Sequence, residues 1–454
     1  MLGNSFYFKV AEIMEETKQH QRSWKSLIFK DATKDKKLIY GLVCELLKYS
    51  SVLEEILTKS QILRYEKKLP KKIVSILIYE LLFLNNLRCN SEWRNTILKY
   101  KSRLNAELAR IKIKRSVSSN AELADGLRFN QFPKYLRINT LKTSLNECIE
   151  HFKSSFFFCK SPEEFEKKAE NAFYVDELID NLLAFSSNTA FFNDEFYLGG
   201  KVFIQDKPSC FPAFILNPPV GSFVIDCCAA PGNKTTHLAM LMQGRGKLMA
   251  FEKSEERFAT LLKMTSLAAF DTSNSNSAGS CNSTVNSGSL KKSSIKGNAN
   301  PSKCYEQNGF LHCINADFLA TNPASPDISE AEYILVDPSC SGSGMVSRLD
   351  HLIDGAVDPE RLKTLSAFQS TILLHAMSFP NVKRVVYSTC SVNDEENERV
   401  VENALAQMKG KFRLVPCLSE WKRRGLRLQE CVRVLPEEDN MNGFFVALFE
   451  RVIS

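Results

Sequence analysis

The second half of the chain alternates short apolar runs with longer helical ones, and this pattern restricts the fold more than any other feature. From about residue 205 onward, "SFVIDCC", "GKLMAFE", "GFLHCINAD", "AEYILVD" and "VKRVVYST" read as strands, with segments such as "NKTTHLAMLM" between them as helices. Short β-branched runs separated by helices are typical of a parallel sheet with helices on both faces. We therefore expect an α/β domain over residues 205–454, with "NGFFVALFERV" as a closing edge strand.

The chain is long enough for two or three domains, and its first 204 residues have a different character. Residues 1–128 are predicted to form a helical domain, because apolar residues recur there at three- and four-residue spacing. Residues 129–204 are shorter and mixed, which indicates a small α/β module. Within its "RINTLK" segment, Arg137, Asn139 and Lys142 are candidates for contacts to phosphate or base edges, or else form the exposed face of a strand.

Charge is distributed unevenly along the sequence. Residues 1–120 contain 24 Lys and Arg against 12 Asp and Glu, whereas the remainder contains 35 against 40. A basic N-terminal third beside a slightly acidic body indicates a polyanionic partner such as nucleic acid. A lysine-rich, solvated helical surface explains the charge equally well.

Residues 271–303 interrupt the alternating pattern. They contain ten serines and almost no large apolar residue, so they cannot bury enough surface to offset the entropy of ordering. We expect a disordered insertion here that affects the fold little, because the cost of closing a loop grows slowly with its length.

The 14 cysteines are scattered and do not form a disulfide framework. The first twenty residues carry charges where a secretion signal would be apolar, so reduced thiols are expected. No apolar run reaches the roughly 18 residues of a membrane span. No Cys-x-x-Cys pair is present, and we expect no metal site.

Acidic residues terminate four of the predicted strands: Asp226, Glu252, Asp317 and Asp337. In an open parallel sheet, ligands bind beyond the carboxyl ends of the strands, so these four acids are expected to line one crevice. The alternative is that each acid only caps the helix that follows it.

The loop after the first strand, "DCCAAPGNKT", has small residues that let a ligand approach backbone amides at the start of a helix. It is not a GxGxxG loop, which disfavours a dinucleotide. Glu252 suits a ribose diol and Asp317 suits the amino group of adenine. S-adenosylmethionine fits these features, since its sulfonium cation favours nearby carboxylates.

Two cysteines follow neighbouring strands, Cys340 in "VDPSCSGSG" and Cys390 in "VVYSTCSV". A thiolate that adds to carbon 6 of a pyrimidine makes carbon 5 nucleophilic enough to accept a methyl group, which is covalent catalysis. A carboxyl group placed as Asp337 is would stabilise that adduct. One thiol is enough for the attack, and the second can assist release. A small buried hydrophobe is the alternative for any single cysteine.

Three motifs, "DCCAAPGNKT", "VDPSCSGSGM" and "YSTCS", closely resemble those of the Sun-domain RNA cytosine-5 methyltransferases. "RYEKKLP", "RINTLK" and "GFFVALFER" are most similar to one branch, the eukaryotic nucleolar enzymes that methylate a cytosine in large-subunit ribosomal RNA. The resemblance implies a Rossmann-like, S-adenosylmethionine-dependent domain with a mostly parallel seven-stranded sheet. It also implies that residues 129–204 bind RNA.

The resemblance also assigns roles to individual residues. Cys390 is implied to be the nucleophile, Cys340 to help the product leave, and Asp337 to contact both the base and the cofactor edge. The remaining cofactor contacts implied by the resemblance are Cys228, Ala229, Ala230, Pro231, Gly232, Asn233, Lys234, Glu252, Arg257 and Asp317.

The expected partners follow from this resemblance: large-subunit ribosomal RNA and pre-ribosomal particles in the nucleolus, bound by a protein that is monomeric. Three other functions fit the sequence. The first is a cytosine-5 methyltransferase that acts on tRNA or another RNA, and the second is a methyltransferase of the same fold with a protein or DNA substrate. The third is an assembly factor that binds ribosomal RNA and whose catalysis is dispensable, although both thiols and all four strand-end acids are present.

Overall fold

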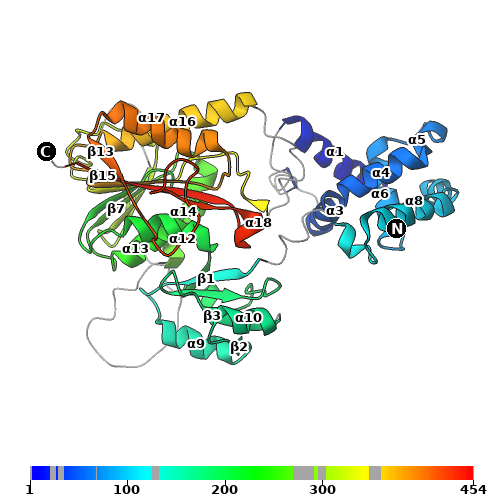
Figure 1. The fold of residues 1–454 in the computed structure, drawn as a ribbon, viewed down its shortest axis with the longest axis horizontal. Helices are drawn as coiled ribbons and strands as arrows, with labels where there is room; N and C mark the ends of the chain where they lie inside the picture. The colour runs from blue at the N-terminus through cyan, green and yellow to red at the C-terminus, as the bar shows by residue number, and fades with distance from the viewer. Residues whose placement is uncertain are drawn as a thin grey trace. The chain divides into compact units, whose positions relative to one another are not determined.

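The computed structural model describes residues 3–20, 27–28, 35–67, 69–124, 132–168, 170–268, 291–294, 303–346 and 359–452. The chain divides into two compact units. One comprises Met1–Asn130 and Met345–Ala356, and the other comprises Gln131–Gly344 and Val357–Ser454. The first unit is helical, and the second contains both β-sheets (Figure 1).

The first unit packs amphipathic helices around one apolar core, which confirms the helical character predicted for this region. The sequence "KKIVSILIYELL" is buried along most of its length and forms the central helix. Asn90 caps another helix by accepting a hydrogen bond from Trp93 N at 2.8 Å. The elements are α1 (Asn4–His20), α3 (Lys36–Lys48), α4 (Ser50–Ser60), α5 (Ile62–Tyr65), α6 (Lys71–Leu82), α7 (Ser91–Leu98), α8 (Lys101–Arg115) and the 3₁₀ turn η1 (Ala121–Leu123).

A small α/β module opens the second unit. Its five strands follow the order β2-β3-β4-β1-β5, and an aromatic core fills the space beneath them. A capping box of Ser144 and Glu147 starts its first helix. The elements are β1 (Lys134–Ile138), α9 (Leu145–Lys153), β2 (Phe157–Phe158), α10 (Pro162–Lys168), β3 (Ala172–Val175), β4 (Leu182–Phe185), α11 (Glu195–Leu198) and β5 (Val202–Ile204).

The large sheet of this unit has the order β13-β15-β12-β11-β6-β7-β10-β9-β8, with β14 paired to β15. Its five central strands run parallel, whereas the pairings toward both edges are antiparallel. The strands are β6 (Phe223–Asp226), β7 (Lys247–Phe251), β8 (Lys291–Ser294), β9 (Lys303–Gln307), β10 (Leu311–Asn315), β11 (Tyr333–Val336), β12 (Arg384–Thr389), β13 (Phe412–Val415), β14 (Val432–Val434) and β15 (Phe444–Arg451).

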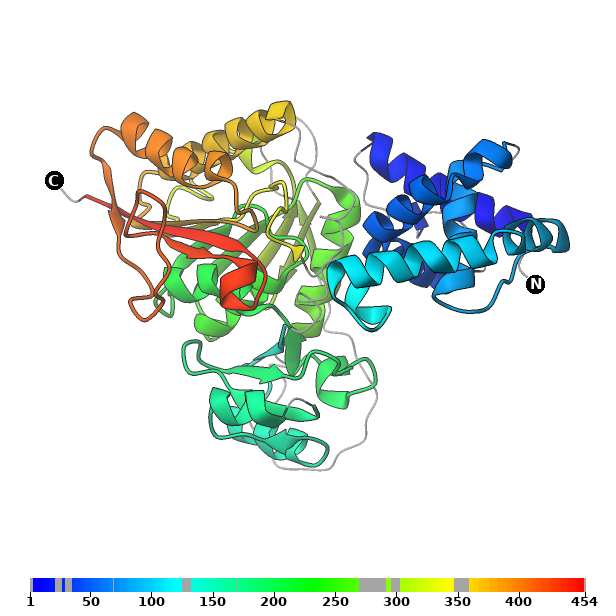
Figure 2. The same cartoon turned by 45° about the vertical axis from the view of Figure 1, so that its right-hand side comes forward.

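Alternate residues of each central strand point to opposite faces of the sheet, and each face has its own apolar cluster. Val224, Leu335 and Val386 join one cluster, whereas Ile225 and Ile334 join the other. Helices α12, α13 and α14 lie on one face, and α16 and α17 lie on the other (Figures 1 and 2). The helical elements are α12 (Lys207–Leu216), α13 (Asn233–Leu241), α14 (Glu255–Ala268), η4 (Phe318–Ala320), α16 (Pro359–Met377), η6 (Asp394–Glu396), α17 (Glu398–Met408) and α18 (Pro436–Asp439). Among the described helices, none is long and apolar enough to cross a membrane.

The structure corrects two details of the predicted sheet. Among the described residues it contains ten strands rather than seven, and it is mostly parallel as predicted, with β9 and β15 reversed. The strand β15 is not an edge strand, because it pairs with β12 on one side and with β13 on the other. Most of residues 271–303 lies outside the described residues, so the expected disorder stays a prediction. Within that range, however, Lys291–Ser294 form the strand β8, which pairs with β9.

Arg137 attaches the small module to the large sheet domain and is fully buried. Its Nε donates to Gln205 Oε1 at 2.7 Å, and its Nη2 donates to Thr236 Oγ1 at 2.7 Å and to Asn233 O at 3.4 Å. Burial lowers the pKa of the Arg137 guanidinium to about 10. The guanidinium therefore holds the first turn of α13 and does not form the exposed face of a strand.

The other two candidate RNA contacts in this segment also bond inside the protein. The side chain of Asn139, which is 1% exposed, donates to Gly200 O and Ala268 O, both at 3.0 Å. Lys142 Nζ donates to Leu267 O at 2.7 Å. The expectation that "RINTLK" reaches RNA was wrong for Arg137 and Asn139, because a period-2 strand pattern does not reveal that both faces of β1 are covered.

We expect Arg137→Ala to lower the free energy of unfolding by about 2–4 kcal/mol, because it opens a cavity and leaves Gln205 and Thr236 without their partner. Lys142→Ala is the matched control from the same segment, with an expected loss of about 1 kcal/mol. Denaturant unfolding of both variants measures the difference. If Arg137→Ala is as stable as the wild type and binds RNA more weakly, the buried role is contradicted and Arg137 contacts RNA as first expected.

Candidate functional site

Four acids stand at the carboxyl ends of neighbouring strands, as the sequence predicted. Asp226 ends β6, Glu252 follows β7, Asp317 follows β10 and Asp337 follows β11. These strands are consecutive in the sheet, in the order β11-β6-β7-β10, so the acids lie along one edge. The alternative of helix capping applies in part, because Asp317 Oδ1 also accepts a hydrogen bond from Leu319 N at 3.0 Å.

The loop from Cys228 to Lys234 leads from β6 into α13 along this edge. Gly232 adopts φ 115°, a left-handed conformation that a side chain would strain, and an added Cβ would lie 3.0 Å from Met264. Burial raises the pKa of the Cys228 thiol, so this cysteine remains a neutral thiol. The loop is therefore suited to present its backbone rather than a reactive sulfur.

Arg257 on α14 joins two predicted cofactor contacts. Its Nη2 donates to Ala230 O at 2.8 Å, and its Nη1 lies 3.4 Å from Glu252 Oε2. Glu252 is 5% exposed, and its Oε1 accepts from Ser254 N at 2.8 Å. The guanidinium thus fixes the position of the cofactor loop relative to the Glu252 carboxylate.

Asp337 lies between two donors rather than alone. Lys234 Nζ is 2.8 Å from Asp337 Oδ2, and Ser388 Oγ donates to Asp337 Oδ1 at 2.6 Å. Burial lowers the pKa of Lys234, but the Asp337 carboxylate, with smaller contributions from Cys390 and Asp226, outweighs burial and raises it. Lys234 therefore remains a cation at the point where the cofactor loop meets the loops of the two cysteines.

The two cysteine loops meet at their thiols. Cys340 Sγ lies 3.1 Å from Cys390 Sγ, and both cysteines are reduced thiols that are partly buried. The hydrogen bond with Cys390, burial and the charge of Glu396 all raise the pKa of Cys340 well above its usual value. Cys340 is therefore held as a thiol whose proton can be shared with Cys390.

A close approach of two glycines supports the loop after Cys340. Gly344 N donates to Cys390 O at 3.0 Å, and Gly443 N donates to Gly344 O at 2.8 Å. A Cβ added to Gly344 would lie 2.5 Å from Gly443 O, which no side chain tolerates without backbone movement. The small residues of "SGSG" thus let three chain segments meet beside Cys390.

Comparison with known proteins agrees with this geometry. The family model described as "16S rRNA methyltransferase RsmB/F" matches residues 213–275 and 302–450. The models of the N-terminal and ferredoxin-like domains of "NOL1/NOP2/Sun domain family member 5" match residues 36–124 and 132–205. A 28S rRNA (cytosine-C(5))-methyltransferase of Mus musculus is 37% identical, covering 98% of this chain and 90% of its own. The chain belongs to the NOL1/NOP2/Sun domain family.

Two further similarities extend over almost the whole chain. The 25S rRNA (cytosine-C(5))-methyltransferase rcm1 of Schizosaccharomyces pombe is 36% identical over 97% of this chain and 90% of its own. The crystal structure of PH0851 aligns with a TM-score of 0.62 and 19% identity over 99% of both chains, which shows a shared fold. The Sun-domain membership predicted from the motifs is confirmed.

S-adenosylmethionine is the cofactor of this Sun-domain methyltransferase, and the residues at this edge of the sheet fit it. Asn233 Oδ1, in the cofactor loop, is buried and has no hydrogen-bond partner among the described residues. Such an acceptor suits a donor group of a bound ligand. The side chains of Glu252, Arg257 and Asp317 surround the same edge, although Asp317 also pairs with Lys253 Nζ at 2.8 Å. In the part of the chain that the structure describes, no group of acidic, His and Cys side chains could hold a metal ion.

Several residues of this Sun-domain site escaped the sequence analysis. Lys234 was assigned to the cofactor loop alone, and its contact with Asp337 was not foreseen. Ser388, Glu396 and Asn397 were not singled out, although the last two lie in the polar run "SVNDEENE" directly after Cys390. That run was the available signal, but acids and amides are common at a helix start, so it did not stand out.

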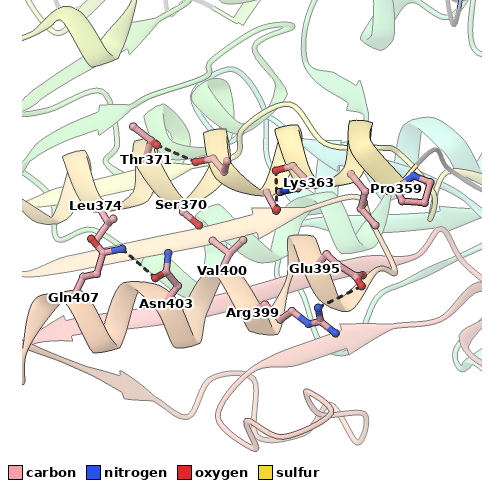
Figure 3. Close-up of a pocket in the computed structure, with 13 residues that line it drawn as sticks. Pro359, Lys363, Ser370, Thr371, Leu374, Glu395, Arg399, Val400, Asn403 and Gln407 are labelled. Carbon is pink, nitrogen blue, oxygen red and sulfur yellow. Dashed lines mark hydrogen bonds and ion pairs between the residues drawn. The ribbon is translucent and has the colours of Figure 1, made fainter.

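A hollow of about 720 Å³ lies apart from the predicted residues, between α16 and α17 (Figure 3). Arg399 Nη1 is 3.7 Å from Glu395 Oε1 at one end, and Gln407 Nε2 donates to Asn403 Oδ1 at 3.0 Å at the other. None of the residues proposed for the cofactor or for catalysis lines it. Its lining residues are Pro359, Leu362, Lys363, Ser366, Ala367, Ser370, Thr371, Leu374, Glu395, Arg399, Val400, Asn403 and Gln407.

Asp226 provides a pH test of the site. Burial, opposed by the hydrogen bond from Thr235, raises its pKa from 3.8 to about 7. The neutral acid is favoured in the fold, so its stabilisation is complete below about pH 4 and is lost as the pH rises through 7. We expect the free energy of unfolding of the wild type, relative to Asp226→Asn, to fall by up to about 1.4 kcal/mol per pH unit within that window. Denaturant unfolding of both proteins between pH 4 and 8 measures this; a difference that does not change with pH would contradict it.

Proposed function

We propose that this protein methylates carbon 5 of a cytosine in large-subunit ribosomal RNA, with S-adenosylmethionine as the methyl donor. The observation that carries the proposal is the pair of thiols, 3.1 Å apart, beside the Lys234–Asp337 ion pair at the edge of the cofactor crevice. The names of the relatives from Mus musculus and Schizosaccharomyces pombe support the choice of reaction and of RNA.

The chemistry explains why two thiols and a carboxyl group are needed. Bound S-adenosylmethionine supplies an electrophilic methyl group. The Cys390 thiolate adds to carbon 6 of the cytosine, which makes carbon 5 nucleophilic. Asp337, in its carboxylic acid form, donates to ring nitrogen 3 and stabilises the adduct. After the methyl group is transferred, the proton on carbon 5 passes to a base such as water, its bonding pair restores the double bond between carbons 5 and 6, and the bond between carbon 6 and sulfur breaks to return the Cys390 thiolate.

Two observations favour Cys390 over Cys340 as the attacking thiol. The charge of a Cys390 thiolate interacts favourably with the Lys234 ammonium, which is one reason why the pKa of Lys234 is raised. Besides its hydrogen bond with Cys390, burial and the nearby charge of Glu396 also raise the pKa of Cys340, which favours the neutral thiol at that position. Cys340 is then placed to assist release, as expected from the resemblance.

The remaining parts of the chain suit a structured RNA substrate. The target base must be unpaired or turned out of its stack, because the reacting ring carbons are inaccessible inside a helix. The basic helices of residues 1–128 and the module of residues 129–204 would hold the surrounding RNA, while residues 205–454 carry the chemistry. The partners proposed here are pre-ribosomal particles in the nucleolus, bound by a monomer.

Cysteine variants test this assignment directly. Cys390→Ala should abolish methyl transfer, because no adduct can form on carbon 6. Cys340→Ala should allow attack but stall release, so that a protein–RNA adduct accumulates. Denaturing electrophoresis of each variant with large-subunit ribosomal RNA separates adduct from free protein. Methylation retained by Cys390→Ala would contradict the assignment, as would an adduct on Cys390→Ala but not on Cys340→Ala.

The substrate is tested separately from the chemistry. Bisulfite mapping of ribosomal RNA from cells that lack the protein should reveal one large-subunit cytosine that has lost its methyl group. If all ribosomal 5-methylcytosines remain and a tRNA cytosine has lost its methyl group instead, the substrate is tRNA and the proposal for ribosomal RNA is wrong.

A further inference from the structure

Two consecutive buried residues, Glu396 and Asn397, connect the loops that carry the two thiols. Glu396 ends η6 and Asn397 precedes α17, and both are 0% exposed. Neither touches the cofactor loop in any of the hydrogen bonds found among the described residues. Their bonds go instead to the chain on either side of Cys340 and Cys390.

Glu396 holds the loop of Cys340. Its Oε1 accepts from Ser341 N at 2.7 Å, and its Oε2 accepts from Ser341 Oγ at 2.6 Å. Gln369 Nε2 on α16 donates to Glu396 Oε1 at 3.0 Å and to Ser339 O at 3.1 Å. The residues before and after Cys340 are therefore tied to one carboxylate, directly or through Gln369. The same carboxylate accepts one longer bond from the loop of Cys390, from Asn393 Nδ2 at 3.3 Å.

Asn397 holds the loop of Cys390 in the same way. Thr389 Oγ1 donates to Asn397 Oδ1 at 2.5 Å, and Asn397 Nδ2 donates to Ser391 O at 2.9 Å. These two partners flank Cys390 in the sequence. One amide side chain thus spans the backbone on both sides of the attacking thiol.

The next residue continues this arrangement. Glu398 forms a buried, two-bond ion pair with Arg433, with Nε and Nη2 both 2.6 Å from the carboxylate oxygens. Arg433 Nη1 also donates to Val392 O at 3.0 Å, two residues beyond Cys390. The ion pair anchors the start of α17, and this fixes the position of the two residues immediately before it, Glu396 and Asn397.

We propose that Glu396 and Asn397 are positioning residues with separate effects: Glu396 sets the place of the release thiol, Cys340, and Asn397 sets the place of the nucleophile, Cys390. The inference rests on the proposed function, because it assigns one step of that reaction to each residue. The distance of 3.1 Å between the sulfurs then depends on both side chains.

The charge of Glu396 has a second consequence. The carboxylate is buried behind the loop of Cys340, and no ion pair among the described residues neutralises it. A negative charge there disfavours a second negative charge on Cys340 and keeps the proton on that sulfur. The Cys340 S–H group can then donate to Cys390, which stabilises the thiolate both when it attacks and when it leaves carbon 6.

The experiment compares Glu396→Ala and Asn397→Ala with the two cysteine variants on large-subunit ribosomal RNA. Glu396→Ala should behave like Cys340→Ala, with the adduct accumulating and turnover reduced roughly tenfold or more, because only release is disturbed. Asn397→Ala should behave like Cys390→Ala, with little adduct and little methylation. Glu395→Ala, whose side chain is 40% exposed and one position away, is the matched control and should keep the activity of the wild type.

A second measurement needs neither RNA nor turnover. Folded protein is treated with iodoacetamide, and peptide mass spectrometry gives the labelling rate at each thiol. Glu396→Gln, which keeps the shape of the side chain, should change labelling mainly at Cys340, and Asn397→Ser should change it mainly at Cys390. Melting temperatures show whether each variant is folded. If an alanine variant does not fold, labelling of Glu396→Gln and Asn397→Ser still tests the proposal.

The possible outcomes separate the two proposals. If the cysteine variants behave as expected but Glu396→Ala and Asn397→Ala lose adduct to the same extent, the separate positioning roles are wrong. If each of these variants alters the labelling of both thiols equally, the roles are also wrong. If Cys390→Ala still methylates RNA, the assignment of Cys390 as the nucleophile fails, and the labelling pattern then decides the positioning roles alone.

Discussion

The parallel pairing of β6, β11 and β12 is the constraint on which the site depends. Tyr333 lies opposite Val224 on one side and opposite Arg384 on the other, so the three strands end at the same edge of the sheet. Because Asp337 and Cys340 follow one strand and Cys390 follows the next, this register brings the carboxylate and the loops of both thiols to the same edge. A shift by one residue would turn every core side chain of a strand to the opposite face, so burial of both faces fixes the register.

Electrostatics at this edge depends on one partly buried lysine. Lys234 is surrounded by Asp337, Asp226 and the thiol of Cys390, and its pKa is raised despite burial. Burial raises the pKa of Asp226 to about 7, with a smaller contribution from the nearby charge of Asp337. An excess of acidic groups over cations suits a cofactor with a positive sulfonium, and the lysine places a cation near the thiol of Cys390.

Features that repeat along the sequence were predictable, and features made by side chains from distant segments were not. The acids at strand ends and the two cysteine loops follow from the alternation of strands and helices, which sets where each strand stops. The prediction for Arg137 was wrong, because its acceptors lie about 70 to 100 positions away in the chain and no local sequence pattern indicates them. The position of β15 inside the sheet was missed for the same reason, since its partners β12 and β13 come earlier in the chain.

The central claim is that Cys390 forms the bond to carbon 6 of the target cytosine. Large-subunit ribosomal RNA transcribed with 5-fluorocytidine tests it most directly, because fluorine on carbon 5 cannot leave as a proton does and the wild-type protein stays attached. After nuclease and protease digestion, mass spectrometry identifies the cysteine that carries the nucleotide. We expect it to be Cys390, and a nucleotide found on Cys340 would contradict the account.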